Sequence, residues 1–521
     1  MSAGYKWAVM GTVAACAATL LVGGSMTAVA AEGGSTFGDA GNANPRFGIE
    51  GNVLSPGLSQ TSVAWGSLPL TNPDTANGIT YYGYNTINPG PLTQDAHEAF
   101  KTEPDKNVYL TVNGHHYLYQ GHETGPRGYV TRIDLDQSNP AQRVSLVTDV
   151  DANGAALPTF DGITWDPFSQ QLLLTAEASF PKGGVWAVQL DANGDAVTGK
   201  AVALPGLGSG GYEGVQNDSD GNVWIVEDIG GSTVPGTNGK KPNSFVYRFV
   251  PVDKTDLTKG GTLQALQVLR KDGTAVTAAQ LASGVDPIIT DLHTYGTSLK
   301  TTWVSVHTGP GAYNATTSAA AASATPFKRP ENGVFRPGTN FGEYYFTETG
   351  DTNASSTLPG AFGAVFRLSQ KSPSAMTGTL SPTLIGDVEH TGFDNIAFAS
   401  NDDLLVVEDA GDGLHAQRNA LDSGYVITLH GNNAKPEKVV RWLAEGRDAS
   451  AYFDATTNPG YNDGDNEITG IHVSDGDATT DGILGAKTPR LFDGTWRAFW
   501  TQQHGDNITW ELAGTNRRSN S

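Results

Sequence analysis

Short apolar runs separated by turn residues fill most of this chain. From about Asn52 to Leu512, runs rich in Val, Ile, Leu, Thr, Trp and Tyr are bounded by Gly, Asn, Asp or Pro, and sustained helical periodicity is almost absent. Two segments, 278–282 and 436–445, fit a short helix or a covering turn. The pattern predicts an all-β fold of many short strands joined by tight turns.

Four hairpins in this pattern repeat one arrangement of residues. Each has an acid beside a small or amide residue, an apolar run, a turn, a second apolar run and another acid. The four units are FDGITWDPFSQQLLLTAE (160–177), YEGVQNDSDGNVWIVED (212–228), ENGVFRPGTNFGEYYFTE (331–348) and FDNIAFASNDDLLVVED (393–409). Because the two ends of an antiparallel hairpin lie side by side, each unit is expected to pair its acids: Asp161 with Glu177, Glu213 with Glu227, Glu331 with Glu348, and Asp394 with Glu408.

The spacing of these units predicts the architecture. A weaker unit, 108–123, ends at Glu123, and a closing unit spans 490–512. The unit-ending acids recur about every 50 to 60 residues, except that the interval from Glu227 to Glu348 is about twice as long, which predicts a divergent unit between 245 and 306. We predict one closed six-bladed β-propeller with loop insertions, including 230–243, 308–325 and 431–464.

The two ends of the chain predict segments outside this domain. Lys6, an apolar stretch from Trp7 to Val22 and the small-x-small triplet 28–30 are typical of a secretory signal peptide covering residues 1–30. An uncleaved N-terminal anchor is the alternative. Residues 31–50 are expected to be a flexible lead-in, 51–512 a single propeller domain and 513–521 a polar tail. The protein is thus expected to be secreted, in the extracellular space or the cell envelope.

Composition narrows the possible partners. The 54 acidic and 32 basic residues give a net charge of −22, which disfavours binding to nucleic acids or anionic membranes. No apolar run after the predicted signal peptide is long enough for stable membrane insertion. Cys16 is the only cysteine, so the mature chain is expected to have no disulfide, zinc-thiolate site or cysteine nucleophile. We expect a monomer whose acidity reflects either solubility or cation binding.

The paired acids suggest where chemistry occurs. If the units are arranged radially, the carboxylates face one another across a shared mouth and need counter-charges. Hard cations are favoured, because Ca²⁺ takes about six to eight oxygen ligands. Arg329 adds a planar guanidinium that suits phosphate, although a salt bridge to Glu331 explains it equally well. His504 is interpreted as a turn residue, with a position lining the mouth as the alternative. Structural and catalytic cation sites both remain open at this stage.

Several ordered motifs resemble the PhoX-type secreted alkaline phosphatase family. They are His122-Glu123, Thr175-Ala176-Glu177, Tyr212-Glu213-Gly214, Glu227-Asp228 with the run 244–251, Arg329-x-Glu331, Phe393-Asp394-Asn395-Ile396 with Glu408-Asp409, and the closing stretch 502–510. Together they span most of the mature chain, and their order is more specific than any single motif. The resemblance implies a six-bladed propeller that hydrolyses phosphate esters with iron and calcium ions held by axial carboxylates.

The resemblance also implies roles for individual residues. It implies phosphate contact by Arg329 and metal ligands at Glu123, Glu177, Glu213, Glu331, Asp394 and Glu408. Two positions depart from the family pattern: Ala176 stands where the family has its iron-binding cysteine, and Tyr212 replaces the histidine of its His-Glu pair. Several calcium ions are therefore the favoured cofactor, and iron is a second candidate.

These inferences lead to one predicted function and two alternatives. We predict an exported metal-dependent phosphatase that acts on small phosphate esters, with a calcium-rich carboxylate cluster at the propeller mouth. The first alternative is a calcium-stabilised propeller that binds a ligand without turnover. The second is a metal-dependent esterase or lactonase, which would not need Arg329.

Overall fold

The computed structural model describes residues 37–46, 51–85, 101–429, 436–447 and 467–514. These residues belong to one compact unit, Phe37–Ser521. The predicted signal peptide, most of the predicted polar tail and most of the insertion 431–464 lie outside the described residues. None of the helices in the described part of the chain is long and apolar enough to cross a membrane.

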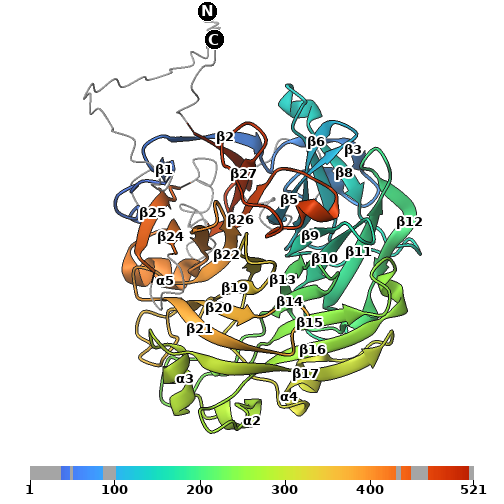
Figure 1. Cartoon of the computed structure of the whole chain (residues 1–521). Helices are drawn as coiled ribbons and strands as arrows, with labels where there is room; N and C mark the ends of the chain where they lie inside the picture. Colours follow the sequence, from blue (N-terminus) through green and yellow to red (C-terminus); the bar gives the residue numbers. More distant parts are fainter. Residues whose placement is uncertain (1–36, 47–50, 86–100, 430–435, 448–466, 515–521) are drawn as a thin grey trace, which may run out of the picture. The chain divides into compact units, whose positions relative to one another are not determined.

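Antiparallel strands dominate this unit, in groups of four that follow one another along the chain (Figure 1). The first group consists of β5 (Pro104–Val112), β6 (His115–His122), β7 (Val130–Asp134) and β8 (Val144–Thr148). The second group consists of β9 (Ile163–Asp166), β10 (Gln171–Ala176), β11 (Gly184–Leu190) and β12 (Ala196–Ala203).

The third and fourth groups share one nine-stranded sheet. The third contains β13 (Tyr212–Asn217), β14 (Val223–Glu227), β15 (Val246–Pro251) and β16 (Gly261–Val268). The fourth contains β18 (Gly333–Phe335), β19 (Glu343–Glu348), β20 (Ala364–Gln370) and β21 (Thr377–Ile385). β17 (Leu299–Gly309) pairs with both β16 and β21 and joins them.

The separate unit predicted between 245 and 306 is therefore wrong. Its first two strands, β15 and β16, complete the third group, and the 11-residue β17 continues the same sheet. The long interval between Glu227 and Glu348 reflects this extension of the sheet, together with the helices inserted around it.

The remaining strands complete the domain. The fifth group contains β22 (Phe393–Phe398), β23 (Asp403–Glu408), β24 (Ser423–Thr428) and β25 (Lys438–Ala444), with β1 (Val53–Leu54) at its edge. The last contains β26 (Glu467–Ser474), β27 (Arg497–Gln503), β28 (Ile508–Gly514) and β2 (Leu58–Ala64). β2 pairs with β28, so the two ends of the domain close one group. β3 (Pro69–Asp74) and β4 (Ile79–Tyr81) pair with each other in a separate two-stranded sheet.

The first strands of the groups form a closed circuit. β5 contacts β9, β9 contacts β13, β13 contacts β18, β18 contacts β22, β22 contacts β26, and β26 contacts β5. The predicted all-β propeller architecture is confirmed. The count of six blades stays a prediction, because two groups share one continuous sheet.

Helices are few and lie in the connections. They are α2 (Ala278–Leu281), α3 (Pro287–Leu292), α4 (Ala315–Ala321) and α5 (Gly411–Arg418). The helix or turn expected at 278–282 is confirmed by α2, whereas the one expected at 436–445 is wrong, since this segment forms β25. Pairing with β24 and burial of Trp442 outweigh the local preference there.

Part of the expected lead-in is packed rather than free. Phe37 is 2 % exposed and stacks edge-on against Trp442 with 5.9 Å between ring centroids. The Ala40 amide donates to the Arg441 carbonyl at 2.7 Å. Residues 37–46 therefore cover the outer side of the fifth group.

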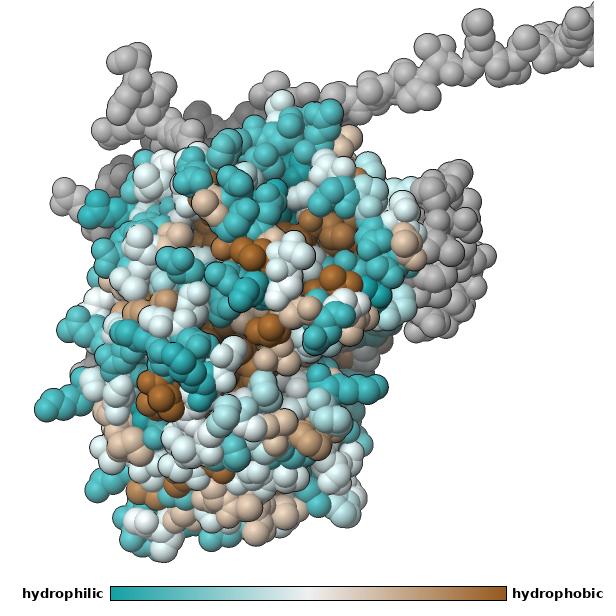
Figure 2. All heavy atoms as spheres, turned by 90° about the vertical axis from the view of Figure 1, so that its right-hand side faces the viewer, coloured by the Kyte–Doolittle hydropathy of each residue, from teal (hydrophilic) through white to brown (hydrophobic). Residues whose placement is uncertain are grey.

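Apolar side chains between neighbouring groups make the scaffold rigid. Trp224, Trp442 and Trp500 are fully buried, Trp224 in one cluster and the other two together in a second. Burial of one such side chain stabilises the fold by about 1.5–3 kcal/mol or more. On the face shown in Figure 2, the hydrophobic residues form small patches among hydrophilic ones. The rigid ring holds the starts of the first strand of each group, here called the inner strands, in fixed positions around one centre.

Candidate metal centre

Irregular pairing at the start of the inner strands aims acids at the centre of the ring. The register with the second strand shifts between Pro104 and Asn107 in β5, and the same shift occurs in β13 and β22. Each shift contains an acid: Asp105, Glu213 and Asp394, which are all buried. A β-bulge turns a side chain out of the regular alternation and is common beside active sites.

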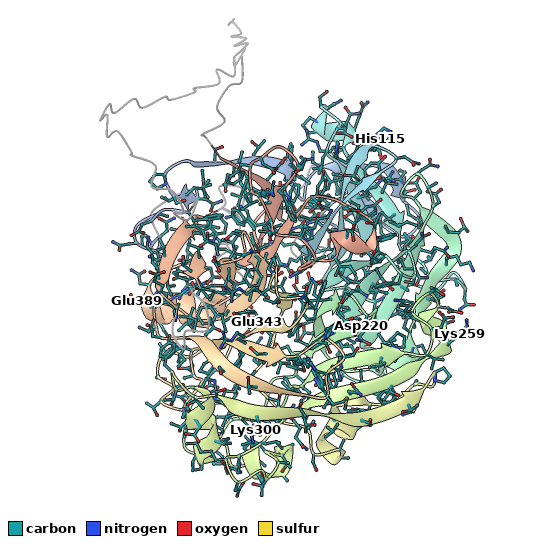
Figure 3. The ribbon with its side chains drawn as sticks, viewed as in Figure 1. His115, Asp220, Lys259, Lys300, Glu343 and Glu389 are labelled. Carbon is teal, nitrogen blue, oxygen red and sulfur yellow. The ribbon has the colours of Figure 1, made fainter. Side chains whose placement is uncertain are left out.

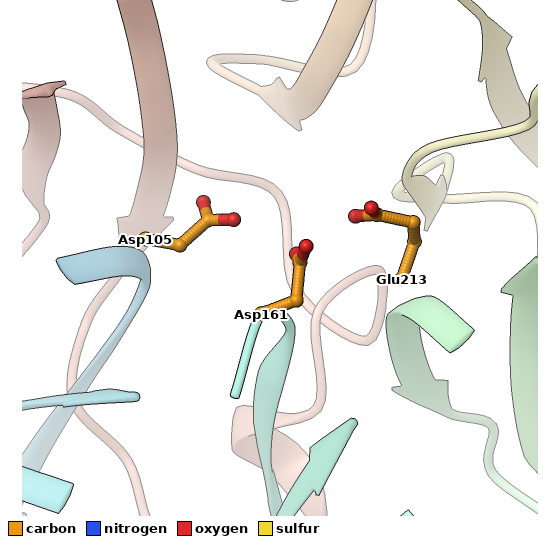
Figure 4. Close-up of side chains that lie close together, drawn as sticks. All are labelled: Asp105, Asp161 and Glu213. Carbon is orange, nitrogen blue, oxygen red and sulfur yellow. The ribbon is translucent and has the colours of Figure 1, made fainter. Parts of the chain in front are cut away.

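Three of the central acids point toward one another (Figure 4). Asp105, Asp161 and Glu213 offer carboxylate oxygens that all lie within 4.8 Å of one another. They belong to three successive hairpins, since Asp161 lies two residues before the start of β9. Two further groups of the same tightness are Glu123 with Asp161 and Glu177, and Glu177 with Glu213 and Asp228. The three groups share members and form one continuous cluster of six carboxylates, which we call the acid cluster.

Burial and mutual repulsion make the charged state of the acid cluster unfavourable without cations. Burial, together with the charges of Asp105 and Glu123, raises the pKa of Asp161 well above its ordinary range. Burial and the charge of Asp228 raise the pKa of Glu177 to about 7. Such a cluster either retains protons or binds cations at neutral pH.

The donor set of the acid cluster fits a hard metal ion. All six candidate ligands are carboxylates, and Asp161 Oδ1 and Asp228 Oδ1 are buried oxygens with no hydrogen-bond partner among the described residues. An unsatisfied buried carboxylate oxygen is costly, and a bound cation would satisfy it. Oxygen-only ligation of this kind suits calcium or magnesium better than softer metals.

The predicted pairing of acids within hairpins holds for one unit. Asp161 and Glu177 fall in the same group of the acid cluster. In the other three units, the strand-ending glutamate turns away from the centre. Glu227 accepts hydrogen bonds from the Tyr247 hydroxyl at 3.0 Å and the Phe245 amide at 3.2 Å. Glu348 accepts one from the Lys328 amide at 2.6 Å and bonds with His293 at 2.7 Å.

Glu408 is likewise held away from the acid cluster. Its carboxylate lies 3.0 Å from Arg418 of α5 and accepts hydrogen bonds from the amides of Thr391 and Ser423 at 2.8 and 3.0 Å. All of its near partners are thus protein donors. The physical reason is strand alternation: consecutive residues point to opposite faces, so in the pairs Glu227-Asp228 and Glu408-Asp409 the aspartate takes the central side.

The other predicted ligands lie at the border of the acid cluster. Glu331 is 3.6 Å from Arg329 and accepts a hydrogen bond from the Thr349 hydroxyl. Asp394 accepts hydrogen bonds from Asn395 at 2.8 and 2.9 Å and from Asn332 at 3.3 Å. Both acids are buried, and burial raises the pKa of Asp394 to about 8. They face the centre but already have donors.

Arg329 lies beside the acid cluster with part of its side chain accessible. Its backbone has a φ of 59°, and its Nε and Nη2 lie 2.8 and 2.7 Å from one oxygen of Asp228. The side chain is 27 % exposed. Although burial opposes the charge, Asp228 and Glu331 outweigh it and raise the pKa of Arg329. The guanidinium is thus a permanent, oriented cation next to the carboxylates.

Two cations of the centre were not anticipated as site residues from the sequence. Lys106 follows Asp105 in β5 and is 3 % exposed, and its ammonium donates to Asn332 Oδ1 at 2.9 Å. Burial lowers the pKa of Lys106 to about 8, against the opposing effect of Asp394 and Asp105. A charged residue in a central bulge is the one local clue to this role.

His504 is the second cation outside the predicted set of site residues. It bonds with Glu103 at 2.7 Å and with Glu467 at 3.0 Å. Burial opposes its charge, but the charge of Glu103 and the hydrogen bond to it raise the pKa of His504 to about 9. Its φ of 69° fits the expected turn, and its position also places it beside the acids of the last group.

A family model described as alkaline phosphatase PhoX matches residues 222–483 of the chain. No curated protein matches the sequence. Among solved structures, Pseudomonas fluorescens PhoX in complex with vanadate, a transition state analogue, is similar with a TM-score of 0.56 and 12 % identity. That match covers 92 % of this chain and 99 % of the PhoX chain.

Two other solved structures are more distant. The Pseudomonas aeruginosa periplasmic gluconolactonase PpgL has a TM-score of 0.35 and 13 % identity, over 74 % of this chain and 97 % of its own. The β-propeller domain of Cps50 (Swd1) from Myceliophteria thermophila has a TM-score of 0.32 and 11 % identity, over 78 % of this chain and 96 % of its own.

Proposed function

The chain belongs to the alkaline phosphatase PhoX family, and we propose on this basis that it is an exported phosphatase whose acid cluster binds calcium ions. The family makes it a metal-dependent hydrolase of phosphate esters. The observation that supports the site is the continuous cluster of six carboxylates beside Arg329. Small phosphate esters are the proposed substrates.

Some of the ligands that we propose were predicted from the sequence, and the others come from the geometry of the acid cluster. Glu123, Glu177 and Glu213 were expected from the sequence, and the structure adds Asp105, Asp161 and Asp228. Glu331 and Asp394 stay predictions at the border of the cluster. We do not retain Glu408 as a ligand, because Arg418 and two backbone amides already surround its carboxylate.

Calcium is the metal that we favour over iron. The ligands of the acid cluster are all oxygens, and the position of the family's cysteine is occupied by Ala176, which is 1 % exposed in β10. A thiolate ligand favours softer transition metals, whereas oxygen ligands suit calcium. When bound, such ions supply Lewis acidity toward phosphoryl oxygens.

The side chains of the protein orient the substrate. Asp228 holds the guanidinium of Arg329 through two contacts of 2.7 and 2.8 Å, which leaves its remaining N–H groups for an anionic ligand. Arginine binds phosphate oxygens with a planar fork, and charge-assisted hydrogen bonds of this kind are about twice as strong as neutral ones. Because Arg329 is a partly exposed cation beside the acid cluster, it is well placed to bind a phosphoryl group and to stabilise the charge that develops on it.

The experiment that tests this function combines metal analysis with two assays. We expect the secreted protein to contain calcium, to hydrolyse p-nitrophenyl phosphate, to lose this activity after treatment with EDTA and to regain it with Ca²⁺. Bis(p-nitrophenyl) phosphate serves as the diester control. Full metal occupancy without hydrolysis of either ester would favour the binding module, and hydrolysis of carboxylic esters or lactones alone would favour the esterase or lactonase.

A further inference from the structure

A lysine ammonium is built into the metal centre itself. Lys106 is 3 % exposed, lies in the bulge of β5 directly after Asp105, and reaches across the centre to the fourth group, where it donates to Asn332 Oδ1 at 2.9 Å. Asn332 in turn donates to Asp394 Oδ1 at 3.3 Å. The ammonium is therefore held in a fixed place between opposite sides of the ring.

This ammonium does not form an ion pair with any single carboxylate of the described residues. Among the ion pairs between described residues, none includes Lys106, and the charges that act on it most strongly are those of Asp394, Asp105, Asp161 and Glu213. Three of these, Asp105, Asp161 and Glu213, form one group of the acid cluster. Lys106 therefore acts on the cluster as a whole.

A fixed positive charge has opposite effects on the metal-free and metal-bound states. Without metal, it offsets the repulsion among the carboxylates. With metal, it repels the bound ions, and the repulsion grows in proportion to the charge of each ion. A trivalent ion at a given position is thus disfavoured about one and a half times as strongly, in free energy, as a divalent ion.

We propose that Lys106 tunes the charge selectivity of the metal centre, shifting the preference of the cluster from trivalent toward divalent ions. This role rests on the proposed function, because it requires that the acid cluster binds metal. It complements Ala176, which removes a thiolate ligand. The two residues act by different means: Ala176 changes the ligand chemistry, and Lys106 changes the electrostatic potential of the site.

Calcium and terbium ions are suitable probes, since both prefer oxygen ligands and differ in charge. Isothermal titration calorimetry at pH 7 would measure the dissociation constants of Ca²⁺ and Tb³⁺ for the full-length protein after removal of metal. In Lys106→Met we expect both constants to decrease, with a larger change for Tb³⁺. A tenfold gain for Ca²⁺ corresponds to a gain of about 30-fold for Tb³⁺.

Three further variants separate charge from packing. Lys106→Gln removes the charge but keeps a donor toward Asn332, so it should shift the ratio of the two constants as Lys106→Met does. Lys106→Arg keeps the charge and should keep the wild-type ratio. Lys259→Met removes the same charge from an exposed lysine that pairs with Asp253 at 2.7 Å, and should leave both constants unchanged (Figure 3).

The outcomes distinguish this inference from the proposed function. If the wild-type protein binds neither ion, the proposed function is wrong. If the wild type binds both ions and the two neutral variants keep its ratio of constants, the role of Lys106 is wrong and the metal site stands. In a neutral variant that folds only with metal, the melting temperature with Tb³⁺ should exceed that with Ca²⁺ by more than it does in the wild type, and an equal difference would also overturn the role.

Discussion

Acids line the whole mouth of the ring, but its two sides differ in what accompanies them. On the side of β5, β9 and β13, six carboxylates gather into the acid cluster. On the side of β18, β22 and β26, each acid has a cation or an amide donor nearby. Arg418 contacts Glu408, and His504 contacts Glu467. Arg329 lies at the border, between Asp228 and Glu331.

The difference shows that the hairpin motif alone does not make a metal site. The same arrangement of acids recurs on both sides, yet the cations come from segments outside the motif. Arg418 belongs to the inserted helix α5, and His504 to the turn between β27 and β28. Where such a segment surrounds the carboxylate with donors, as at Glu408, the acid is held by protein partners. Where a buried oxygen is left without a donor, as at Asp161 Oδ1 and Asp228 Oδ1, it is available to a metal ion.

The largest effect is expected from Asp161→Asn in the acid cluster. Asp161 belongs to two of the three groups in the acid cluster, so its loss weakens two sets of ligands at once. We expect hydrolysis of p-nitrophenyl phosphate to decrease on the order of 10³-fold. Asp166→Asn, a change of another buried aspartate in the same hairpin, is the control and should retain activity. An unchanged rate in Asp161→Asn would contradict the proposed site.

On the opposite side of the ring, at β18, β22 and β26, loss of an acid should change the stability of the fold. Glu408→Gln leaves Arg418 with one ionic partner fewer in a buried network that also includes Asp422. We expect the free energy of unfolding to decrease by about 3 kcal/mol, because breaking a buried ion pair strands a charge. Urea denaturation measures this change. The metal content of the folded variant should equal that of the wild type, and loss of metal would show that Glu408 is a ligand after all.

Substitution of Arg329, at the border between the two sides, should impair substrate hydrolysis more than metal binding. In Arg329→Ala we expect kcat/KM for p-nitrophenyl phosphate to decrease by about 30-fold, as expected when charge-assisted hydrogen bonds worth about 2 kcal/mol are lost. Arg329→Lys keeps the charge without the planar fork and should recover part of the loss. Equal kcat/KM values in the wild type and Arg329→Ala would argue for a site that does not recognise phosphate.

The smallest effect concerns pH. Because the pKa of Glu177 is raised to about 7 in the folded protein from an ordinary value of 4.5, the folded state binds the proton more tightly than the unfolded state. The metal-free protein should therefore lose stability as the pH rises from about 5 to 7, on the order of 3 °C in melting temperature. With excess Ca²⁺ the trend should reverse, because metal binding requires deprotonated ligands. Calorimetric scans with EDTA and with Ca²⁺ would show whether the slopes have opposite signs.

The sequence predicted the architecture better than the identity of the ligands. Acids followed by glycine or asparagine mark the starts of the inner strands, and Asp161, Glu213 and Asp394 all lie there. The sequence could not show which residue of Glu227-Asp228 or Glu408-Asp409 faces the centre. A bulge shifts the register by one residue, and the facing residue depends on pairing that only the assembled sheet determines.

The cations of the centre were harder to predict because their partners are remote in the sequence. Lys106 and Asn332 are separated by 226 residues, and His504 and Glu103 by 401 residues. Locally, Lys106 resembles any strand lysine, and His504 resembles any histidine in a turn. Their roles arise only when closure of the ring brings the first, fourth and last groups together.

Metal analysis of a matched pair of variants tests the central claim, that the acid cluster on the side of β5, β9 and β13 holds the metal. Asp228 and Asp409 each follow a strand-ending glutamate, and both are followed along the chain by a loop or helix at the mouth. We predict that purified Asp228→Asn contains less calcium per chain than the wild type, whereas Asp409→Asn keeps the wild-type content. Loss of calcium from Asp409→Asn with full retention in Asp228→Asn would contradict the account.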